Sequence, residues 1–372
     1  MSYPVNGMEN NVEKVAGVLR NDAKLCDEVL VLALGDCTLC LRSNCQQLID
    51  RLGAYFSAVT TTIGAVADID IVAVDSDVLN LGLEFADWAR EPGKKGRKDA
   101  YVDLPDGRLI LKVRTGMLFL QCETHKIAAG PCLAHDNQVI NFINSQYMNW
   151  LQQRDWRICH AAAVVRDGSG LAIAGFSGGG KSTLMLHFLD DDGLSYLTND
   201  RLFVRKNGSL LQAAGIPKLP RINPGTIVNN PKLFDLIPKH QREVLLRLPR
   251  HELWALEEKY DVQVDQVYGA GRMVFSAPLS AFLVLNWQPD SDRTADIRPV
   301  NLSERRDLLG AIMKSPGPFY QYADGSFYQD QTPLDEQAYL DILEGVSVYE
   351  ACGRIDFKAI KEICLETMLD WS

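Results

Sequence analysis

The fold is decided by the stretch Leu171-Ala-Ile-Ala-Gly175-Phe-Ser-Gly-Gly-Gly180-Lys181-Ser182-Thr183-Leu-Met-Leu-His-Phe-Leu189, which predicts a strand, a glycine-rich loop and a helix. The short apolar run before the first glycine is typical of a buried strand. The loop then follows the spacing G-x-x-x-x-G-K-S, the Walker A pattern of phosphate-binding loops. This pattern also occurs by chance, but a strand before it and a helix after it are the context in which it binds phosphate.

The chemistry of phosphate binding explains the residue types in this loop. Glycines let successive backbone N–H groups turn inward around an anion, and the following helix directs the positive end of its dipole to the same place. The lysine reaches the β- and γ-phosphates, and the serine hydroxyl binds Mg²⁺. Kinases, ATPases and GTPases share the loop, but the chain has no guanine-binding signature of the N/T-K-x-D type. The sequence therefore predicts ATP and Mg²⁺ as cofactors, with a nucleotide-binding set of Gly175, Phe176, Ser177, Gly178, Gly179, Gly180, Lys181, Ser182 and Thr183.

Length and composition limit the possible protein classes. A chain of 372 residues suggests about two domains of roughly 150 residues each. The net charge of −10 argues against nucleic acid as a partner, because nucleic-acid-binding proteins present a basic face. No apolar run approaches the roughly 18 residues of a membrane helix, and the N-terminus lacks the regions of a signal peptide. We therefore expect a cytoplasmic protein with no membrane partner.

Cys37 and Cys40 form a C-x-x-C pattern, which raises the alternative of a zinc site. They fall in a predicted strand, where a step of three residues places side chains on opposite faces. No second pair of Cys or His follows at zinc spacing. We therefore expect these cysteines to be free thiols.

Residues 1–155 are predicted to form an N-terminal α+β domain of unknown role. Its predicted elements are a helix at 9–26, a hairpin at 28–42, a helix at 46–56, a strand at 67–74, a hairpin at 100–122 and a helix at 137–154. The basic loop at 91–98 either meets a phosphate or acidic partner or is a solvated turn. Positioning a substrate and forming a homo-oligomer are the two roles considered for this domain.

Residues 156–372 are predicted to form the catalytic domain. The apolar run 157–166 is predicted to be one strand that pairs with 171–174, so His160 lies on the strand next to the phosphate-binding loop. A lone histidine in an apolar run is as readily a core residue as a functional one, and both interpretations stay open for His160.

Asp200 follows the predicted strand 194–198. A strand that returns beside the loop brings its C-terminal end to the nucleotide, where a carboxylate can hold Mg²⁺ or accept a proton from an attacking hydroxyl. The alternative is an aspartate that caps a local turn. Asp200 comes only 19 residues after Lys181, a spacing that suits a compact kinase. We expect Ser182 and Asp200 to hold the metal.

The region 215–275 is predicted to be mostly irregular, because it contains Pro217, Pro220, Pro224, Pro231, Pro238 and Pro249. Within it, a helix is predicted at 243–260, interrupted at Pro249, and a return to strand at 259–264. Its basic residues Lys218 and Arg221 either neutralise the transferred phosphate or are solvated surface charges. A long loop region beside a nucleotide site often acts as a lid. The remaining chain is predicted to form a strand at 281–287, a helix at 302–313, a helix at 334–345, a strand at 346–353 and a helix at 356–370.

Three motifs in this order resemble the catalytic domain of HPr kinase/phosphorylase: His160-Ala-Ala-Ala-Val164, Gly175-Phe-Ser-Gly-Gly-Gly-Lys-Ser-Thr183 and Leu197-Thr-Asn-Asp-Arg201. The resemblance is closest to the HPr-kinase-related kinases, of which one branch, HprK-related kinase B, is found beside an ATP-grasp protein. It is specific over about residues 155–210 and leaves out the N-terminal domain. It implies an α/β (mixed α+β) fold, with a P-loop kinase domain of the HPr kinase C-terminal type around a mixed sheet and a smaller N-terminal domain. An ATP-grasp protein is the partner that it implies.

By motif, His160 corresponds to the active-site histidine of that family, and Asn199-Asp200 corresponds to its Asp-Asp pair. The first Asp of the pair is proposed as the base and the second holds the metal. This chain departs from the family at Asn199, which cannot take a proton. Either Asp200 serves both roles, or His160 helps, or catalysis rests on positioning and charge neutralisation alone. The family signature Glu-Ile-Arg-Gly-Leu-Gly is replaced by Pro220-Arg221-Ile-Asn-Pro-Gly225, which leaves phosphorylase activity and HPr as the substrate unsupported.

The leading hypothesis is a kinase that uses ATP and Mg²⁺ to phosphorylate a hydroxyl on a protein serine or a small molecule. In this hypothesis Lys181 binds phosphates, Ser182 and Asp200 hold Mg²⁺, Asp200 or His160 orients the acceptor, and Arg221 stabilises the transferred group. Two alternatives remain, a non-catalytic nucleotide-binding or scaffold protein and a simple ATPase.

Overall fold

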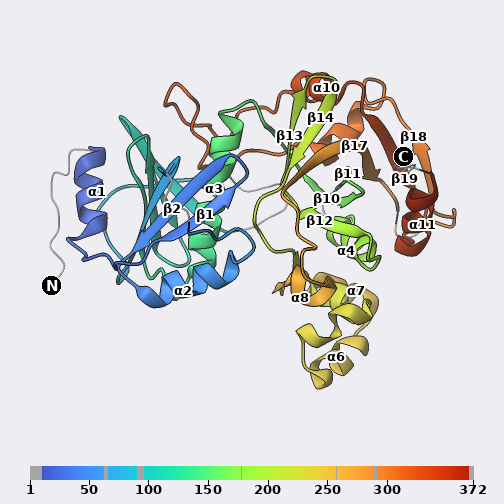
Figure 1. Cartoon of the computed structure of the whole chain (residues 1–372), viewed down its shortest axis with the longest axis horizontal. Coiled ribbons are helices and arrows are strands. Elements are labelled where there is room, and N and C mark those ends of the chain that lie inside the picture. The colour runs from blue at the N-terminus through green and yellow to red at the C-terminus, as the bar shows by residue number, and fades with distance from the viewer. Residues whose placement is uncertain are drawn as a thin grey trace. The chain divides into compact units, whose positions relative to one another are not determined.

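The chain divides into two compact units, described here from a computed structural model that covers residues 11–62, 66–89, 96–176, 178–256, 258–288 and 291–367. The first unit contains residues 1–154 and 315–333, and the second contains residues 155–314 and 334–372. Figure 1 labels their elements. The segment 315–333, which the sequence prediction placed in the C-terminal domain, belongs to the first unit.

In the described part of the first unit, the strands form a mixed sheet in the order β1-β2-β3-β8-β7-β6-β5-β4. Their bounds are β1 Leu30–Leu34, β2 Cys37–Ser43, β3 Ile69–Asp75, β4 Ala86–Asp87, β5 Asp99–Leu104, β6 Gly107–Lys112, β7 Met117–Cys122 and β8 Lys126–Gly130. Strand β3 pairs in parallel with β2 and β8, and the other neighbours are antiparallel. The prediction of a single hairpin at 100–122 was wrong, because the chain reverses again at Gly116, where φ is +72°.

Among the described residues of this unit, the helices that cover the sheet are α1 (Val12–Arg20), α2 (Gln46–Tyr55) and α3 (Asp136–Gln152). The sequence predicted all three, because their apolar residues recur at helical spacing. Side chains of one sheet face, such as Leu118 and Leu120, share a core with α1. The intervening Phe119 points to the other face, where its ring meets Phe142 of α3.

The segment 315–333 is held in the first unit by buried polar side chains of β6 and β7. The fully buried Arg108 donates hydrogen bonds to the backbone oxygens of Pro318 (3.1 Å) and Tyr328 (2.8 Å). Gln121 donates to the oxygen of Phe319 at 2.8 Å. The chain therefore leaves the second unit after residue 314 and returns to it at residue 334.

In the described part of the second unit, the strands form a mixed sheet in the order β12-β10-β11-β17-β14-β13-β9, with β19 pairing to both β17 and β18. Their bounds are β9 Arg157–Cys159, β10 Ala161–Arg166, β11 Ser169–Gly175, β12 Leu194–Thr198, β13 Leu202–Asn207, β14 Leu210–Ala214, β17 Ser276–Leu285, β18 Asp296–Pro299 and β19 Ser347–Cys352. The strand β11, which leads into the glycine-rich loop, pairs in parallel with β17 and antiparallel with β10.

The prediction of one strand over 157–166 was wrong, because the strand breaks at His160. Strand β9 pairs with β13, whereas β10 pairs with β11 and β12. Between them, the backbone N–H of His160 donates to the oxygen of Ile312 at 2.6 Å. The histidine therefore stands at a corner between two parts of the sheet, and not in the middle of a strand.

Alternating side chains of β10 and β11 supply two separate cores, as the period of two in a strand requires. Val164 and Ile173 pack with α4 (Lys181–Leu189) and α11 (Phe357–Thr367), whereas Ala163 and Ala172 pack with α9 (Leu309–Ile312) and α10 (Glu336–Leu343). The second unit is therefore a sheet with helices on both faces. The predicted helix at 302–313 is shorter than expected, because only a 3-10 turn at Arg306–Leu308 and α9 are helical.

The region 215–275 contains more helix than the sequence predicted. The predicted helix at 243–260, interrupted at Pro249, is present in part as two short helices on either side of that proline, and the predicted return to strand is present at Tyr260–Asp261, whereas the other short helices were not predicted. Its elements are β15 Arg221–Ile222, α5 Pro224–Val228, the 3-10 helix η1 Pro231–Leu236, α6 Lys239–Leu246, α7 Arg250–Ala255, β16 Tyr260–Asp261 and α8 Val264–Tyr268. Pro224 and Pro231 begin helices, and Pro238 and Pro249 stand at the N-caps of α6 and α7. Proline fits the first turn of a helix because its missing N–H would have no partner there.

All nine cysteines are free thiols. Cys37 is buried and Cys40 is half-buried on β2, as expected for alternating faces. Burial raises the pKa of the Cys37 thiol to about 12, so this group is inert at neutral pH.

The described residues form a mixed α/β protein with two mixed sheets, which agrees with the predicted fold class in its general form. No helix within the described ranges is both long enough and apolar enough to cross a membrane.

Candidate functional site

The loop between β11 and α4 has the strand–loop–helix form that the sequence predicted. Gly178 and Gly180 adopt φ values of +76° and +86°, which other residues rarely adopt. A Cβ at Gly180 would also lie 2.7 Å from the ring of Phe357, so this position accepts only glycine. Gly180 is the N-cap of α4, so the free N–H groups of the first helical turn point toward the loop. Ser177, a predicted nucleotide-binding residue, lies outside the described residues.

Hydrogen bonds among the described residues hold the loop. Gly179 N–H donates to the oxygen of Phe176 at 2.9 Å, and the Trp287 indole N–H donates to the oxygen of Gly179 at 2.9 Å. The Lys181 ammonium donates to the oxygen of Gly175 at 2.8 Å. The loop is therefore held from outside by Trp287, a residue that the sequence analysis did not single out.

Ser182 is bonded to Asn199 in this arrangement. The Ser182 hydroxyl donates its proton to the Asn199 side-chain oxygen at 2.8 Å. A serine hydroxyl has one proton and two lone pairs, so this bond leaves the lone pairs available to a cation. The sequence analysis expected Ser182 to share a metal with Asp200, whereas the neighbour of Ser182 is Asn199.

Asp200 instead faces three basic residues. Its carboxylate lies 3.0 Å from Nε2 of His160, 3.3 Å from Nζ of Lys314 and 3.9 Å from Nε of Arg201. Although burial opposes ionisation, the hydrogen bond with His160 and the charges of Lys314 and Arg201 hold the pKa of Asp200 well below its ordinary value. Asp200 is therefore a carboxylate at neutral pH. Its φ of +79° is unusual for any residue other than glycine.

The structure brings His160 and Asp200 together and adds Lys314. This lysine follows α9 and is 114 residues from Asp200, and its side chain is only 15% exposed. No local pattern around residue 314 marks it as a site residue, because only the pairing of distant strands brings it beside Asp200.

A cavity of about 650 Å³ opens over the loop, and most of the predicted site residues line it. The predicted residues that line it are Gly178, Gly179, Gly180, Lys181, Ser182, Thr183, Asp200 and Arg221. Thr183 meets a further lining residue, Thr226 of α5, through a 3.0 Å hydrogen bond between their hydroxyls. The phosphate-binding loop and the Asp200 carboxylate therefore face the same space.

Of the two basic residues predicted from the region 215–275, one lines the cavity and the other does not. Arg221 lines the cavity, where it also forms an ion pair of 3.0 Å with Asp261. Lys218 is not among the lining residues. Burial, together with the nearby charges of Arg201 and Arg221, lowers the pKa of Lys218 to about 7, so that much of it is uncharged at neutral pH.

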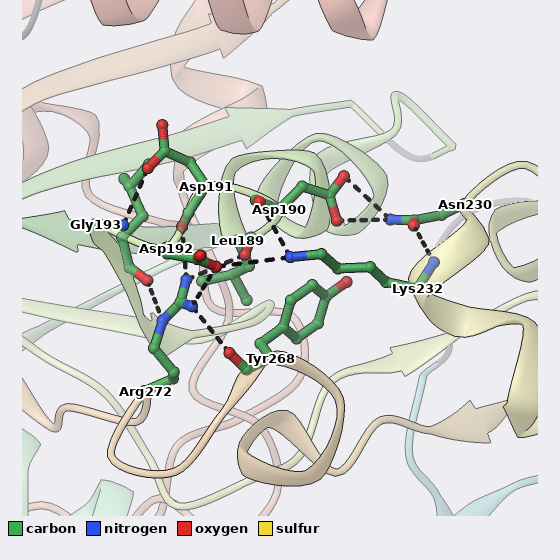
Figure 2. A network of polar contacts seen from close by, with 10 residues as sticks. Leu189, Asp190, Asp191, Asp192, Gly193, Asn230, Lys232, Tyr268 and Arg272 are labelled. Carbon is green, nitrogen blue, oxygen red and sulfur yellow. Dashed lines mark hydrogen bonds and ion pairs between the residues drawn. The ribbon is translucent and has the colours of Figure 1, made fainter.

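Figure 2 shows how α4 is anchored at the end opposite the loop. The Arg272 guanidinium donates to the backbone oxygens of Leu189 (3.0 Å), Asp191 (2.7 Å) and Leu194 (2.6 Å). Lys232 donates to the oxygen of Asp190 at 3.1 Å. These cations satisfy carbonyl groups that a helix leaves unpaired and oppose the negative end of its dipole. The helix that supports the loop is therefore fixed at both ends.

The residues near the loop fit a magnesium ion that arrives with a nucleotide. Among the described residues no group of three or more His, Cys, Asp or Glu side chains could hold a metal. Mg²⁺ in nucleotide sites usually takes one or two protein oxygens and completes its shell with phosphates and water. The Ser182 hydroxyl, oriented by Asn199, is a suitable protein ligand of this kind.

No family model matches the sequence, and no curated protein matches it. Among solved structures, the chain is similar to that of the Hpr(Ser) kinase/phosphatase from Coxiella burnetii, with a TM-score of 0.29 and 13% sequence identity. The match covers 58% of this chain and 92% of that chain. The resemblance is distant, and a TM-score of this size assigns neither a substrate nor the role of any residue.

Proposed function

We propose that the protein is a kinase that uses ATP and Mg²⁺ to phosphorylate a hydroxyl group of a protein serine or a small molecule. The observation that carries the proposal is one cavity that contains both a phosphate-binding loop and an ionised carboxylate, Asp200. The loop amides and Lys181 bind the phosphates. Ser182, oriented by Asn199, is the protein ligand of the cation.

The proposed reaction transfers the γ-phosphoryl group in line. The hydroxyl oxygen of the acceptor forms a bond to the γ-phosphorus while the bond from that phosphorus to the β–γ bridging oxygen breaks, and the bridging oxygen keeps the electron pair as ADP leaves. The hydroxyl proton passes to the Asp200 carboxylate, which His160 holds in position at 3.0 Å. Bound Mg²⁺ neutralises the charge that develops on the phosphate oxygens. Arg221 at the cavity wall supplies a further positive charge.

The test is an assay of ATP consumption with Mg²⁺ and panels of peptide and small hydroxyl acceptors. We expect Asp200→Asn to lower the transfer rate by about 10²-fold or more, the usual effect of losing a general base, while ATP affinity changes little. Lys181→Ala should weaken ATP binding and abolish transfer. Full transfer activity in the Lys181→Ala protein would contradict the proposal.

A second candidate function is nucleotide binding without catalysis. It is favoured by Asn199, which places a neutral amide beside Ser182 where a carboxylate would bind the cation more strongly. This function predicts ATP binding with no turnover on any acceptor, and an Asp200→Asn protein identical to the parent. Steady release of ADP without an acceptor would instead indicate a simple ATPase.

A further inference from the structure

Trp287 is a buried residue that does not line the cavity, although its indole reaches the glycine-rich loop. It comes two residues after Leu285, which pairs with Gly175 where β17 and β11 lie parallel. The backbone N–H groups of Asn286 and Gln288, on either side of Trp287, donate to oxygens at and just beyond the end of β19, at 2.9 Å each. The sheet therefore fixes the position of this residue beside the loop.

Aromatic packing fixes the indole ring itself. The ring of Phe357 meets it edge to face, with centroids 5.0 Å apart and planes at 85°, an arrangement that aromatic rings prefer. Phe357 in turn stacks on His187 of α4, with centroids 5.6 Å apart and planes at 23°. The indole therefore has little freedom to turn away from the loop.

The bond from this indole orients one peptide of the loop. The Trp287 N–H donates to the oxygen of Gly179 at 2.9 Å. The peptide between Gly179 and Gly180 is trans and planar, so its C=O and N–H point in opposite directions. Because the oxygen is turned to Trp287, the N–H of Gly180 points to the cavity that both glycines line. Within the described residues this N–H has no acceptor, so it is available to an anion.

Without the indole, the same peptide has little to hold it in this orientation. It joins two glycines, and glycine adopts positive and negative φ with similar ease. A rotation of the peptide plane would turn the Gly179 oxygen into the cavity, where its partial negative charge would repel phosphate oxygens. The Trp287 N–H stabilises the orientation that offers the Gly180 N–H.

We infer that Trp287 is a positioning residue for phosphate binding, because it holds the Gly179–Gly180 peptide with the Gly180 N–H directed to a phosphate oxygen of the nucleotide. The inference rests on the proposed function and deepens it, because it gives a role in ligand binding to a side chain outside the cavity. A hydrogen bond from a backbone N–H to a charged phosphate oxygen is stronger than one between neutral groups. The orientation of this single peptide therefore affects the affinity for any ligand that places phosphates in the loop.

Incorporation of β-(3-benzothienyl)alanine at position 287 of the full-length protein tests the inference, because this amino acid keeps the shape of tryptophan and replaces the indole N–H by sulfur. Calorimetric titrations with ATP and with inorganic tripolyphosphate, both with Mg²⁺, measure binding. We expect both affinities to fall by the same factor, about threefold to tenfold, the effect of losing one neutral hydrogen bond. The midpoint of thermal unfolding should change by no more than about 3 °C.

Trp287→Phe is a second variant, which removes the donor but keeps an apolar ring, and both affinities should fall in it as well. Trp156→Phe is the matched control, because Trp156 is in the second unit, packs against the Arg205 guanidinium and does not line the cavity. It should leave both affinities unchanged.

Unchanged binding of either ligand by the folded benzothienylalanine protein would overturn the inference, since a loss confined to ATP would place the effect at the nucleoside. The proposed function fails in a different way, when the parent protein binds ATP but phosphorylates no hydroxyl; the effect of the indole on binding is then still measured. A parent protein that binds neither ligand would overturn both.

Discussion

The hydrogen bond between Ser182 and Asn199 would set the charge of the proposed cation site. Asn199 accepts the serine proton at 2.8 Å, as a carboxylate would, but it adds no negative charge. When the protein offers only neutral oxygens, a divalent cation gains little binding free energy until the nucleotide phosphates are present. The protein should therefore take up Mg²⁺ mainly as its complex with the nucleotide.

Asn199→Asp should create a cation site that no longer needs a nucleotide. The substitution keeps the acceptor for Ser182 and adds one negative charge, so we expect the affinity of the nucleotide-free protein for Mn²⁺ to rise by about tenfold, equivalent to about 1.4 kcal/mol. Electron paramagnetic resonance of free Mn²⁺ measures this affinity. Asn207→Asp, which adds the same charge at the exposed end of β13, is the control. Equal Mn²⁺ affinity in the two variants would show that no cation binds beside Ser182.

At the residue scale, the sequence predicted the parts of the site that are close together in the chain. Gly180, Lys181 and Ser182 follow a local spacing that is typical of a loop between a strand and a helix, so the position and form of this loop could be predicted. Lys314 and Trp287 could not, because each reaches the site only through strand pairing over more than 100 residues. The partner of Ser182 could not be predicted either, since Asn199 and Asp200 are adjacent in the chain and either side chain could have met the serine hydroxyl.

At the scale of elements, β19 carries a buried carboxylate. The side chain of Glu350 is 2% exposed, and Arg305 binds both of its oxygens, at 2.9 and 3.0 Å. Arg298 and Asn286 donate to it as well, at 3.0 and 2.7 Å. The hydrogen bonds from Arg305, followed by those of Asn286 and Arg298, outweigh burial and lower the pKa of Glu350 to about 2. This charge ties β19 to β18 and to the end of β17.

Glu350 should stabilise the fold in a manner that depends on pH. Because the pKa is lower in the folded chain, its contribution is complete above the ordinary pKa of 4.5 and is lost as the pH falls toward 2. A pKa that moves from 4.5 to about 2 corresponds to about 3 kcal/mol. We therefore expect Glu350→Gln to lower the free energy of unfolding by about that amount at pH 7. Urea denaturation at pH 7, 5, 4 and 3 measures the difference, which should shrink below about pH 4.5.

Glu362→Gln on α11 is the control for this series, because this side chain is exposed and should change stability by less than about 0.5 kcal/mol. If the effect of Glu350→Gln were the same at pH 7 and pH 3, altered packing and not the charge would explain it.

The elements differ in how well the sequence predicted them. Long helices such as α3 and the buried strand β11 were predicted because their apolar periodicity is local. In the region 215–275, the helix interrupted at Pro249 was predicted, but the short helices that begin at Pro224 and Pro231 were missed, because those prolines were interpreted as breaks. The break at His160 was missed for another reason. The apolar run is continuous there, and only the pairing of β9 and β10 with different strands reveals it.

At the scale of the whole molecule, the chain passes between the units more than once. After Lys314, which binds Asp200, residues 315–333 form part of the first unit. On its return, Tyr339 of α10 donates to the oxygen of Ile158 at 2.5 Å and bonds to the backbone of Lys314. Sequence periodicity could not predict that residues 315–333 belong to the first unit, because this segment has no regular apolar pattern and is held by distant side chains such as Arg108.

This connectivity predicts which truncated proteins fold. Removal of residues 1–154 alone should give an insoluble product, because it leaves 315–333 without Arg108 and Gln121 and exposes Phe319, now 8% exposed and packed on Phe119. If 315–333 is also replaced by a flexible Gly/Ser linker of about ten residues, the second unit keeps both of its cores and should fold. Solubility, a cooperative thermal transition and ATP affinity measure the outcome.

The two truncated proteins serve as controls for each other, since both lack residues 1–154 and only one of them retains residues 315–333. The physical basis of the prediction is that buried aromatic surface and backbone oxygens in 315–333 are satisfied only within the first unit. Lys314 and Tyr339 lie on either side of residues 315–333, so the linker must leave the hydrogen bond between them intact. An ATP affinity close to that of the full chain would indicate that the site is undisturbed. A soluble, cooperatively folded protein that retains 315–333 would contradict the division into these two units. Failure of the linker variant to fold would instead show that the second unit depends on the first for its stability.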